Sequence, residues 1–355
     1  MSRFDPYEHL SMILKPDGTL TRIHESKKVP PTGDHEESLS DQPFLTKDVP
    51  LNTDNKTWVR IFRPTKIPSN NNSIASQLLP IIIYFHSGGI ILFGAADMII
   101  HELCGCFATE FPAIVVSVEY RLVPENRLPA AYDDAIDAVL WVRKQALDSN
   151  GERWLRDFAD FSRCFLAGCS TGGNIAFLAG LRALDIELEP VRISGLILNQ
   201  PLFGGVQRTE SELMFATDEI TPLPAVDLVW DLALPIGADR DHWFCNPMVE
   251  GPHHGKIGLL GRCLVIGYGG DLTIDRQQEF VRMLVRHGVQ VVAQFDDIGF
   301  HGIDLVDPRR ALARKKKNGP AFVLQKRKAA SPSVELRING IQQQMMRNTW
   351  EIASC

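Results

Sequence analysis

Short apolar runs that alternate with helical patterns constrain the fold of this 355-residue chain more than any other feature. LPIIIYFH (79–86), AIVVSVEY (113–120) and RCFLAG (163–168) are apolar at nearly every position, which is typical of strands buried on both faces. Between them, AAYDDAIDAVLWVRKQA (130–146) has apolar residues at helical spacing. The pattern predicts an α/β fold with a mostly parallel central sheet and helices on both faces. Further strands are predicted at 56–64, 193–200, 262–268 and 289–295, and a further helix around 275–288.

This pattern ends near residue 310, so we predict a single domain over 1–310. Residues 204–240 lie between two predicted strands and are too many for a simple connection, which indicates an inserted helical lid. The segment 311–355 is basic and lacks apolar periodicity, and we expect it to be a largely disordered tail.

Composition and charge exclude several classes of protein. Apolar residues make up 45% of the chain, and the net charge of −6 argues against nucleic acid or an anionic membrane as the main partner. No apolar run is long enough to cross a bilayer, and the N-terminus has no apolar segment typical of a secretion signal. The seven cysteines are scattered and odd in number, so we expect reduced thiols in a cytoplasmic protein. No His/Cys cluster has the spacing of metal ligands, and we expect neither a metal nor another cofactor.

The stretch FLAGCSTGGNIAFLAG (165–180) joins a predicted strand to a predicted helix through a very tight turn. Gly168-Cys169-Ser170-Thr171-Gly172 fits the pattern G-x-S-x-G, in which a strained turn exposes a serine hydroxyl at the end of a strand. Small residues are needed at 168 and 172 because larger side chains would collide with the neighbouring strand and helix. Ser170 is therefore a candidate nucleophile.

A serine hydroxyl needs a base, and at this kind of turn the partners follow in the order acid, then histidine. His301 follows the last predicted strand of the domain, and Asp271 follows the strand before it, so both are candidates. Asp275 is an alternative acid one turn later, although its place at a helix start suits a favourable charge at the helix N-terminus. Asp296 and Asp297 are less suitable because they are so close to His301 in sequence.

Acyl transfer also needs donors for the negatively charged oxygen that forms during the reaction. YFHSGGI (84–90) follows a predicted strand and offers the backbone N–H groups of Gly88 and Gly89. The N–H group of Thr171, directly after the candidate nucleophile, is a third donor.

Five blocks, in this order along the chain, resemble the hormone-sensitive-lipase-like branch of the α/β-hydrolases, and within it the plant carboxylesterases, including acetyl esterases of alkaloid synthesis. The blocks are HSGG (86–89), VEYRLVPENRLPAAYDDA (118–135), GCSTGGNIA (168–176), GDLTIDRQ (270–277) and FHG (300–302). With the similar segment 5–22, the resemblance extends over roughly residues 5–310. It implies an α/β-hydrolase fold and a metal-free esterase whose N-terminal segment, about 1–40, joins 204–240 in capping the site.

The chain departs from this family at three places. Ser87 stands where the family usually has glycine, although Gly88 and Gly89 match the donor positions. GDLTID replaces the usual Asp-Pro-Leu and keeps Asp271, and the tail does not resemble the family's closing helix. The resemblance also implies that Arg121 and Glu125 brace the loop beneath the site rather than bind substrate.

The leading hypothesis is hydrolysis of a small carboxylic ester through Ser170, His301 and Asp271, with acetylated specialised metabolites as one candidate class of substrate. Two alternatives stay open. One is an eliminating dehydratase or cyclase on the same scaffold. The other is a non-catalytic receptor for a small molecule, which the presence of His301 disfavours because the gibberellin receptor that resembles this family lacks that histidine. The sequence does not predict an oligomeric state.

Overall fold

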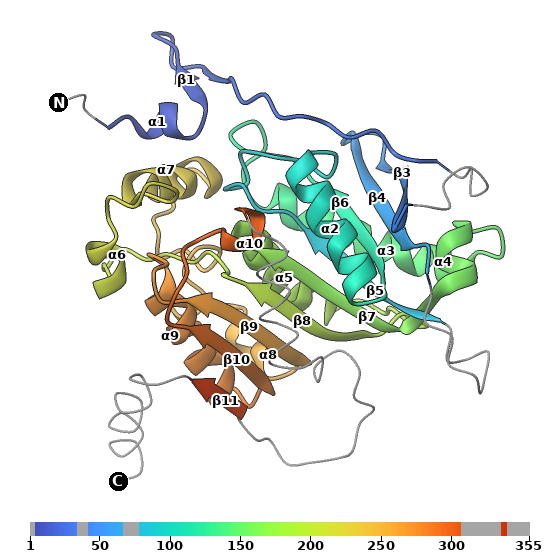
Figure 1. The fold of residues 1–355 in the computed structure, drawn as a ribbon. Coiled ribbons are helices and arrows are strands. Elements are labelled where there is room, and N and C mark those ends of the chain that lie inside the picture. The colour runs from blue at the N-terminus through green and yellow to red at the C-terminus, as the bar shows by residue number, and fades with distance from the viewer. Residues whose placement is uncertain (1–3, 34–41, 67–77, 307–334, 339–355) are drawn as a thin grey trace.

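The computed structural model describes residues 4–33, 42–66, 78–306 and 335–338. In these parts of the chain a nine-stranded sheet has the order β11-β10-β9-β8-β7-β5-β6-β4-β3, as Figure 1 shows. Neighbouring strands from β6 to β11 are parallel, whereas β3 and β4 are antiparallel to their neighbours. The strands are β3 (Phe44–Asn52), β4 (Thr57–Pro64), β5 (Leu79–Phe85), β6 (Ile114–Glu119), β7 (Ala159–Cys169), β8 (Ile193–Asn199), β9 (Arg262–Tyr268), β10 (Val291–Asp296) and β11 (Glu335–Ile338).

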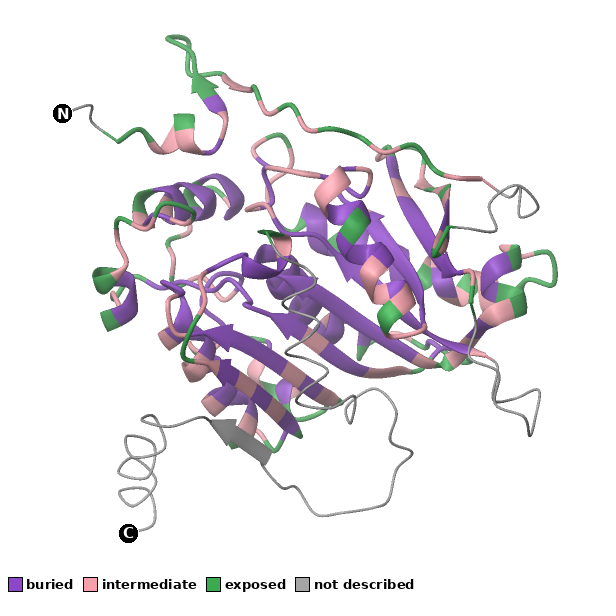
Figure 2. Ribbon diagram, viewed as in Figure 1, coloured by how far each residue is buried: buried purple, intermediate pink, exposed green. Residues whose placement is uncertain are grey.

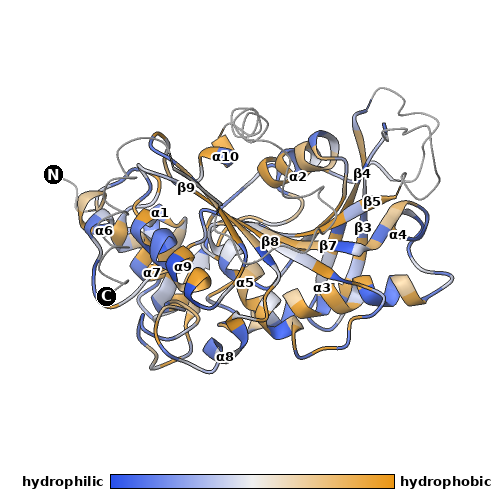
Figure 3. Ribbon diagram, turned by 90° about the horizontal axis from the view of Figure 1, so that it is seen from below, coloured by the Kyte–Doolittle hydropathy of each residue, from blue (hydrophilic) through white to orange (hydrophobic). Residues whose placement is uncertain are grey.

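Helices cover both faces of this sheet, and β5 shows why its sequence is apolar throughout. Successive side chains of a strand point to opposite faces, and Ile81 and Ile83 belong to one core cluster while Ile82 and Tyr84 belong to another. The central strands are accordingly buried (Figure 2). Figure 3 shows α2 (Met98–Glu110) and α10 (Ile303–Val306) on one side of the sheet. On the other side lie α3 (Ala130–Leu147), α5 (Thr171–Ala183), α8 (His254–Ile257) and α9 (Ile274–Arg286). A short helix, α4 (Arg153–Phe158), precedes β7.

Two segments far apart in sequence lie together beside the carboxyl ends of the parallel strands (Figure 1). The N-terminal segment contains α1 (Pro6–His9), β1 (Met12–Leu14) and β2 (Leu20–Arg22), and the insertion after β8 contains α6 (Glu210–Met214) and α7 (Leu223–Ala233). We call these two segments the cap. The side chain of His9 contacts the Ile220 carbonyl oxygen across 3.1 Å, which joins the two segments. Arg22 forms an ion pair with Glu125 at 3.0 Å, which joins the cap to the loop after β6.

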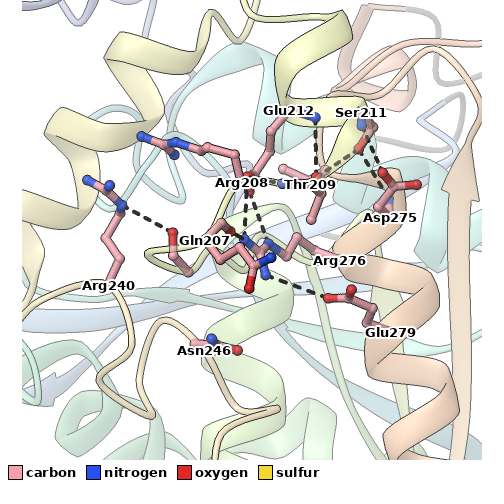
Figure 4. Close-up of polar contacts among 12 residues, drawn as sticks. Gln207, Arg208, Thr209, Ser211, Glu212, Arg240, Asn246, Asp275, Arg276 and Glu279 are labelled. Carbon is pink, nitrogen blue, oxygen red and sulfur yellow. Dashed lines mark hydrogen bonds and ion pairs between the residues drawn. The ribbon is translucent and has the colours of Figure 1, made fainter.

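A buried ion pair fastens the cap to the helix that follows the loop of Asp271 (Figure 4). Arg276 Nε on α9 donates to Glu212 Oε1 on α6 across 3.0 Å, and both side chains are almost fully buried. Beside this pair, the Ser211 amide donates to Asp275 Oδ2 across 2.8 Å. Glu212 also closes the capping box of α6 with Thr209, so one carboxylate stabilises the helix and its attachment.

Replacing Glu212 by alanine should lower the free energy of unfolding by about 3 kcal/mol, because Arg276 would keep a buried charge without its main partner. Urea denaturation followed by circular dichroism measures this loss. The matched control is Glu210→Ala on the same helix, where the side chain is exposed and the expected loss is at most about 0.5 kcal/mol. Equal stability of the two variants would show that the ion pair does not hold the cap in place.

The structure confirms the predicted fold class and every predicted strand, with boundaries shifted by a few residues at most at the elements' ends. The insertion contains the two helices α6 and α7, and its role as a lid stays a prediction. Within the tail, residues 335–338 differ from the prediction because they form β11 against β10. The rest of the tail lies outside the described residues, so its disorder stays a prediction. No helix in the described part of the chain is long and apolar enough to cross a membrane.

Candidate active site

Ser170 lies between β7 and α5 in a backbone conformation that non-glycine residues rarely adopt, with φ of +56°. The two glycines around it permit the turn. A Cβ atom on Gly168 would lie 2.1 Å from the Gly172 carbonyl oxygen, and one on Gly172 would lie 2.0 Å from the Phe85 carbonyl oxygen. Both distances are far below van der Waals contact, so the turn excludes any side chain at 168 and 172. Strain of this kind is found at functional sites.

The structure brings the three predicted site residues together from three separate loops. His301 Nε2 lies 2.8 Å from Ser170 Oγ, and His301 Nδ1 lies 2.8 Å from Asp271 Oδ2. Asp271 is fully buried, and the other two side chains are nearly so. With Nδ1 protonated and donating to Asp271, Nε2 is free to accept the proton of the Ser170 hydroxyl.

The competing acid, Asp275, points elsewhere. Its Oδ2 atom accepts the amide of Ser211 in the cap, and Asp271 is the carboxylate that contacts the imidazole. Asp271 lies in the loop after β9 and faces the histidine, whereas Asp275, four residues later, lies in the first turn of α9 and faces α6.

Asp271 is held by donors on both of its oxygens. Oδ1 accepts the amide and the hydroxyl of Thr273, each across 2.8 Å. Oδ2 accepts the side-chain amides of Gln200 and Gln277 at 2.8 and 2.9 Å, in addition to His301. Sequence reasoning missed these three residues, because side-chain amides and hydroxyls carry no spacing that marks such a role.

Burial and charge act in opposite directions on this pair. Burial alone would lower the pKa of His301, but the negative charge of Asp271 and its hydrogen bond outweigh burial, and the pKa of His301 is raised. Burial alone would raise the pKa of Asp271, but the charge of His301 and the surrounding donors keep that pKa below its usual value. Asp271 is therefore a carboxylate at neutral pH, and it stabilises the protonated imidazole.

The loop after β5 begins against the turn of Ser170, since a Cβ atom on Gly172 would lie 2.0 Å from the Phe85 carbonyl oxygen and 2.6 Å from that of His86. In this loop Gly88 and Gly89 have φ values of +111° and +68°. In the described parts of the chain, the amides of Gly88, Gly89 and Thr171 donate to no backbone or side-chain acceptor. The Val229 side chain of the cap lies 3.0 Å from where a Cβ atom of Gly89 would be, so α7 covers this loop.

His86 organises the start of that loop. Its ring stacks on Tyr120 with centroids 4.1 Å apart, and its Nδ1 atom contacts the Ser87 carbonyl oxygen across 2.8 Å. The Tyr120 hydroxyl donates to the His86 carbonyl oxygen. Burial lowers the pKa of His86 to about 4, so the ring is neutral at physiological pH. Ser87 is buried and is not among the residues with positive φ, so a serine fits where the family usually has glycine.

Arg121 and Glu125 each have a structural partner. Arg121 pairs with buried Asp134 on α3 at 2.8 Å, and Glu125 pairs with Arg22 of the cap. These two ion pairs agree with the expectation that Arg121 and Glu125 brace the loop beneath the site. Among the described residues, no group of three or more His, Cys, Asp or Glu side chains is arranged to hold a metal ion. The expectation that no cofactor is used stays a prediction.

Known proteins that resemble this chain in sequence or fold include α/β-hydrolases and esterases. Residues 82–305 match a family model described as an α/β-hydrolase fold. A probable carboxylesterase of Arabidopsis thaliana is 53% identical over 311 residues, covering 87% of this chain and 94% of that protein. A 3-O-acetylpapaveroxine carboxylesterase of Papaver somniferum is 50% identical over 312 residues, covering 86% and 95%. Among solved structures, a thermostable esterase from Pseudomonas putida has a similar fold, with a TM-score of 0.67 at 21% identity, covering 80% of this chain and 85% of that one.

Proposed function

This chain belongs to the α/β-hydrolase family and is a carboxylesterase, and on that basis we propose that Ser170, His301 and Asp271 are its catalytic triad. The observation that carries the proposal is the position of His301, whose two ring nitrogens lie 2.8 Å from the Ser170 hydroxyl and from the Asp271 carboxylate. The strained turn at Ser170 supports it, because such a turn presents the hydroxyl at the end of its strand.

In the proposed reaction, Ser170 Oγ attacks the ester carbonyl carbon while His301 Nε2 takes the hydroxyl proton. The amides of Gly88, Gly89 and Thr171 donate to the resulting oxyanion. The C–O bond to the alcohol then breaks, and His301 returns the proton to the departing alcohol. Water, deprotonated by His301, attacks the acyl-enzyme and releases the acid with Ser170 restored. Asp271 keeps the imidazole in the required tautomer throughout.

We propose small esters as substrates, with acetyl esters of specialised metabolites as the leading class. Two relatives from Papaver somniferum, 50% and 48% identical to this chain, are 3-O-acetylpapaveroxine carboxylesterases, which supports an acetylated substrate here. A residue that shapes the acyl pocket under this proposal is Val229, which lies against the loop of Gly89. A single domain over 1–310, capped by about 1–40 and 204–240, and a cytoplasmic location remain part of the proposal.

Hydrolysis in water enriched in oxygen-18 tests this function against elimination on the same scaffold. With p-nitrophenyl acetate and an acetylated alkaloid as substrates, an acyl-enzyme mechanism places one heavy oxygen in the released acetate. Elimination of acetate from the alkaloid would release unlabelled acetate and an alkene. Binding of the acetylated compound without any turnover would instead indicate a receptor.

On the acidic side of the pH profile, which we call the acid limb, kcat/KM should fall with an apparent pKa above 6.5. His301 must be neutral to accept the serine proton, and Asp271 raises the pKa of His301 above its ordinary value of 6.5. Activity should therefore fall as the pH decreases through that raised pKa. Rates between pH 5 and 9 with p-nitrophenyl acetate, corrected for spontaneous hydrolysis, measure the limb. A limb well below pH 6.5 would contradict the assignment of Asp271 as the partner of His301.

A further inference from the structure

Gln200, the first residue after β8, occupies an unusual place beside the proposed triad. It is fully buried, and its backbone has φ of +46°, a conformation rare for a residue with a side chain. Its own amide donates to the Ile266 carbonyl oxygen of β9 across 2.7 Å, which fixes this strained turn against the neighbouring strand. The turn directs the side chain between the loop of Asp271 and the loop of His301.

The side-chain amide of Gln200 makes three contacts there. Its Nε2 atom donates to Asp271 Oδ2 across 2.8 Å and to the Phe300 carbonyl oxygen across 3.0 Å. Its Oε1 atom accepts the amide of Gly302 across 3.0 Å. The amide thus holds both residues that flank His301, together with the carboxylate oxygen that His301 contacts.

We propose that Gln200 is a positioning residue of the esterase reaction, which sets the place of the His301 loop relative to Asp271. This inference rests on the proposed triad. Only a side chain with one acceptor and two donors at its tip, at this length, makes all three contacts. Asparagine is one methylene shorter, and methionine has a similar size but no donor.

Gln277 provides a matched control because it shares only part of this arrangement. Its Nε2 atom donates to the same Oδ2 atom of Asp271 and to the Thr273 hydroxyl, each across 2.9 Å. Its Oε1 atom has no partner among the described residues, and neither of these contacts reaches the His301 loop. Loss of the Gln277 amide removes a donor to Asp271 but leaves Phe300 and Gly302 in place.

The test compares Gln200→Met with Gln277→Met on p-nitrophenyl acetate. We expect Gln200→Met to lower kcat by about 100-fold with KM within about 3-fold, because misplacement of a catalytic group acts on the transition state. Gln277→Met should lose about 10-fold or less. The acid limb should stay within half a pH unit of the wild type in both variants, since Asp271 keeps its charge.

Thermal unfolding of each variant separates positioning from stability, because rates measured well below both melting temperatures report only folded enzyme. If Gln200→Met does not fold, Gln200→Glu keeps the size and the acceptor for Gly302, and once ionised it should lose at least about 30-fold in kcat. A folded Gln200→Met with kcat within threefold of wild type, or no lower than Gln277→Met, would overturn the proposal. Ser170→Ala is measured alongside. If that variant stays active, the triad is wrong. If it is inactive, the nucleophile is right, and the kcat of Gln200→Met then tests only the positioning role of Gln200.

Discussion

Replacing Ser170 by alanine should abolish ester hydrolysis, with kcat/KM falling by at least about 10⁴-fold. Alanine has no oxygen to form the acyl-enzyme, so only substrate binding and the oxyanion donors would remain to accelerate attack by water. The fold should survive. The serine already accommodates the strained φ of +56°, and alanine places no atom where the serine does not.

Kinetics with p-nitrophenyl acetate and circular dichroism measure the two parts of this expectation. Ser162→Ala is the control on the same strand, since among the described residues its hydroxyl donates to Asp160 alone, at the far end of β7. It should retain wild-type activity. A folded Ser170→Ala variant with more than about a thousandth of the wild-type kcat/KM would remove Ser170 from the nucleophile role.

Asp271→Asn replaces one carboxylate oxygen by an NH₂ group, and it should lower kcat by about 10³- to 10⁴-fold. Both oxygens of Asp271 face N–H donors, the Thr273 amide on one side and His301 with two glutamine amides on the other. An asparagine must present its NH₂ group to one of these sets. Turned toward His301, the NH₂ group makes Nδ1 an acceptor, so that Nε2 carries the proton and no longer accepts one from Ser170. Turned away, it meets the Thr273 amide and leaves two donors opposed in a buried site.

Asp275→Asn is the matched control, because the same change is made four residues later. Asp275 Oδ2 accepts one amide, that of Ser211, and the carbonyl oxygen of asparagine can accept it equally well. Activity should stay within about threefold of wild type, as for substitutions away from the chemistry. If Asp275→Asn were the more damaging change, the choice of acid would be wrong. Steady-state kinetics of both variants on one substrate decide between these outcomes.

The sequence predicted the parallel strands well, because burial on both faces requires runs such as Ile81 to Ile83 that few other structures tolerate. Edge elements were harder to predict. β3 contains Lys47, Asp48 and Pro50, residues that suit the exposed edge of a sheet but do not indicate a strand in isolation. Helix α2 also escaped prediction, since glycine and cysteine interrupt its apolar pattern.

The candidate site was predictable where a residue type and its place on the fold coincide. A serine in a G-x-S-x-G turn and a histidine after the last strand of the domain satisfy this condition, and the structure places Ser170 and His301 in contact. The support around Asp271 was not predictable. Gln200 follows β8 and Gln277 lies on α9, and only the three-dimensional packing of these parts shows that both amides reach one carboxylate oxygen.

Mass spectrometry after reaction with a fluorophosphonate tests the central claim most directly, since this reagent forms a stable bond to an activated serine hydroxyl. The enzyme is labelled with excess reagent, its intact mass is measured, and the modified peptide is sequenced. The triad predicts one label per chain on Ser170, complete loss of esterase activity, and no label on Ser170→Ala. An unlabelled but active enzyme, or a label on another residue that accounts for the loss of activity, would contradict it.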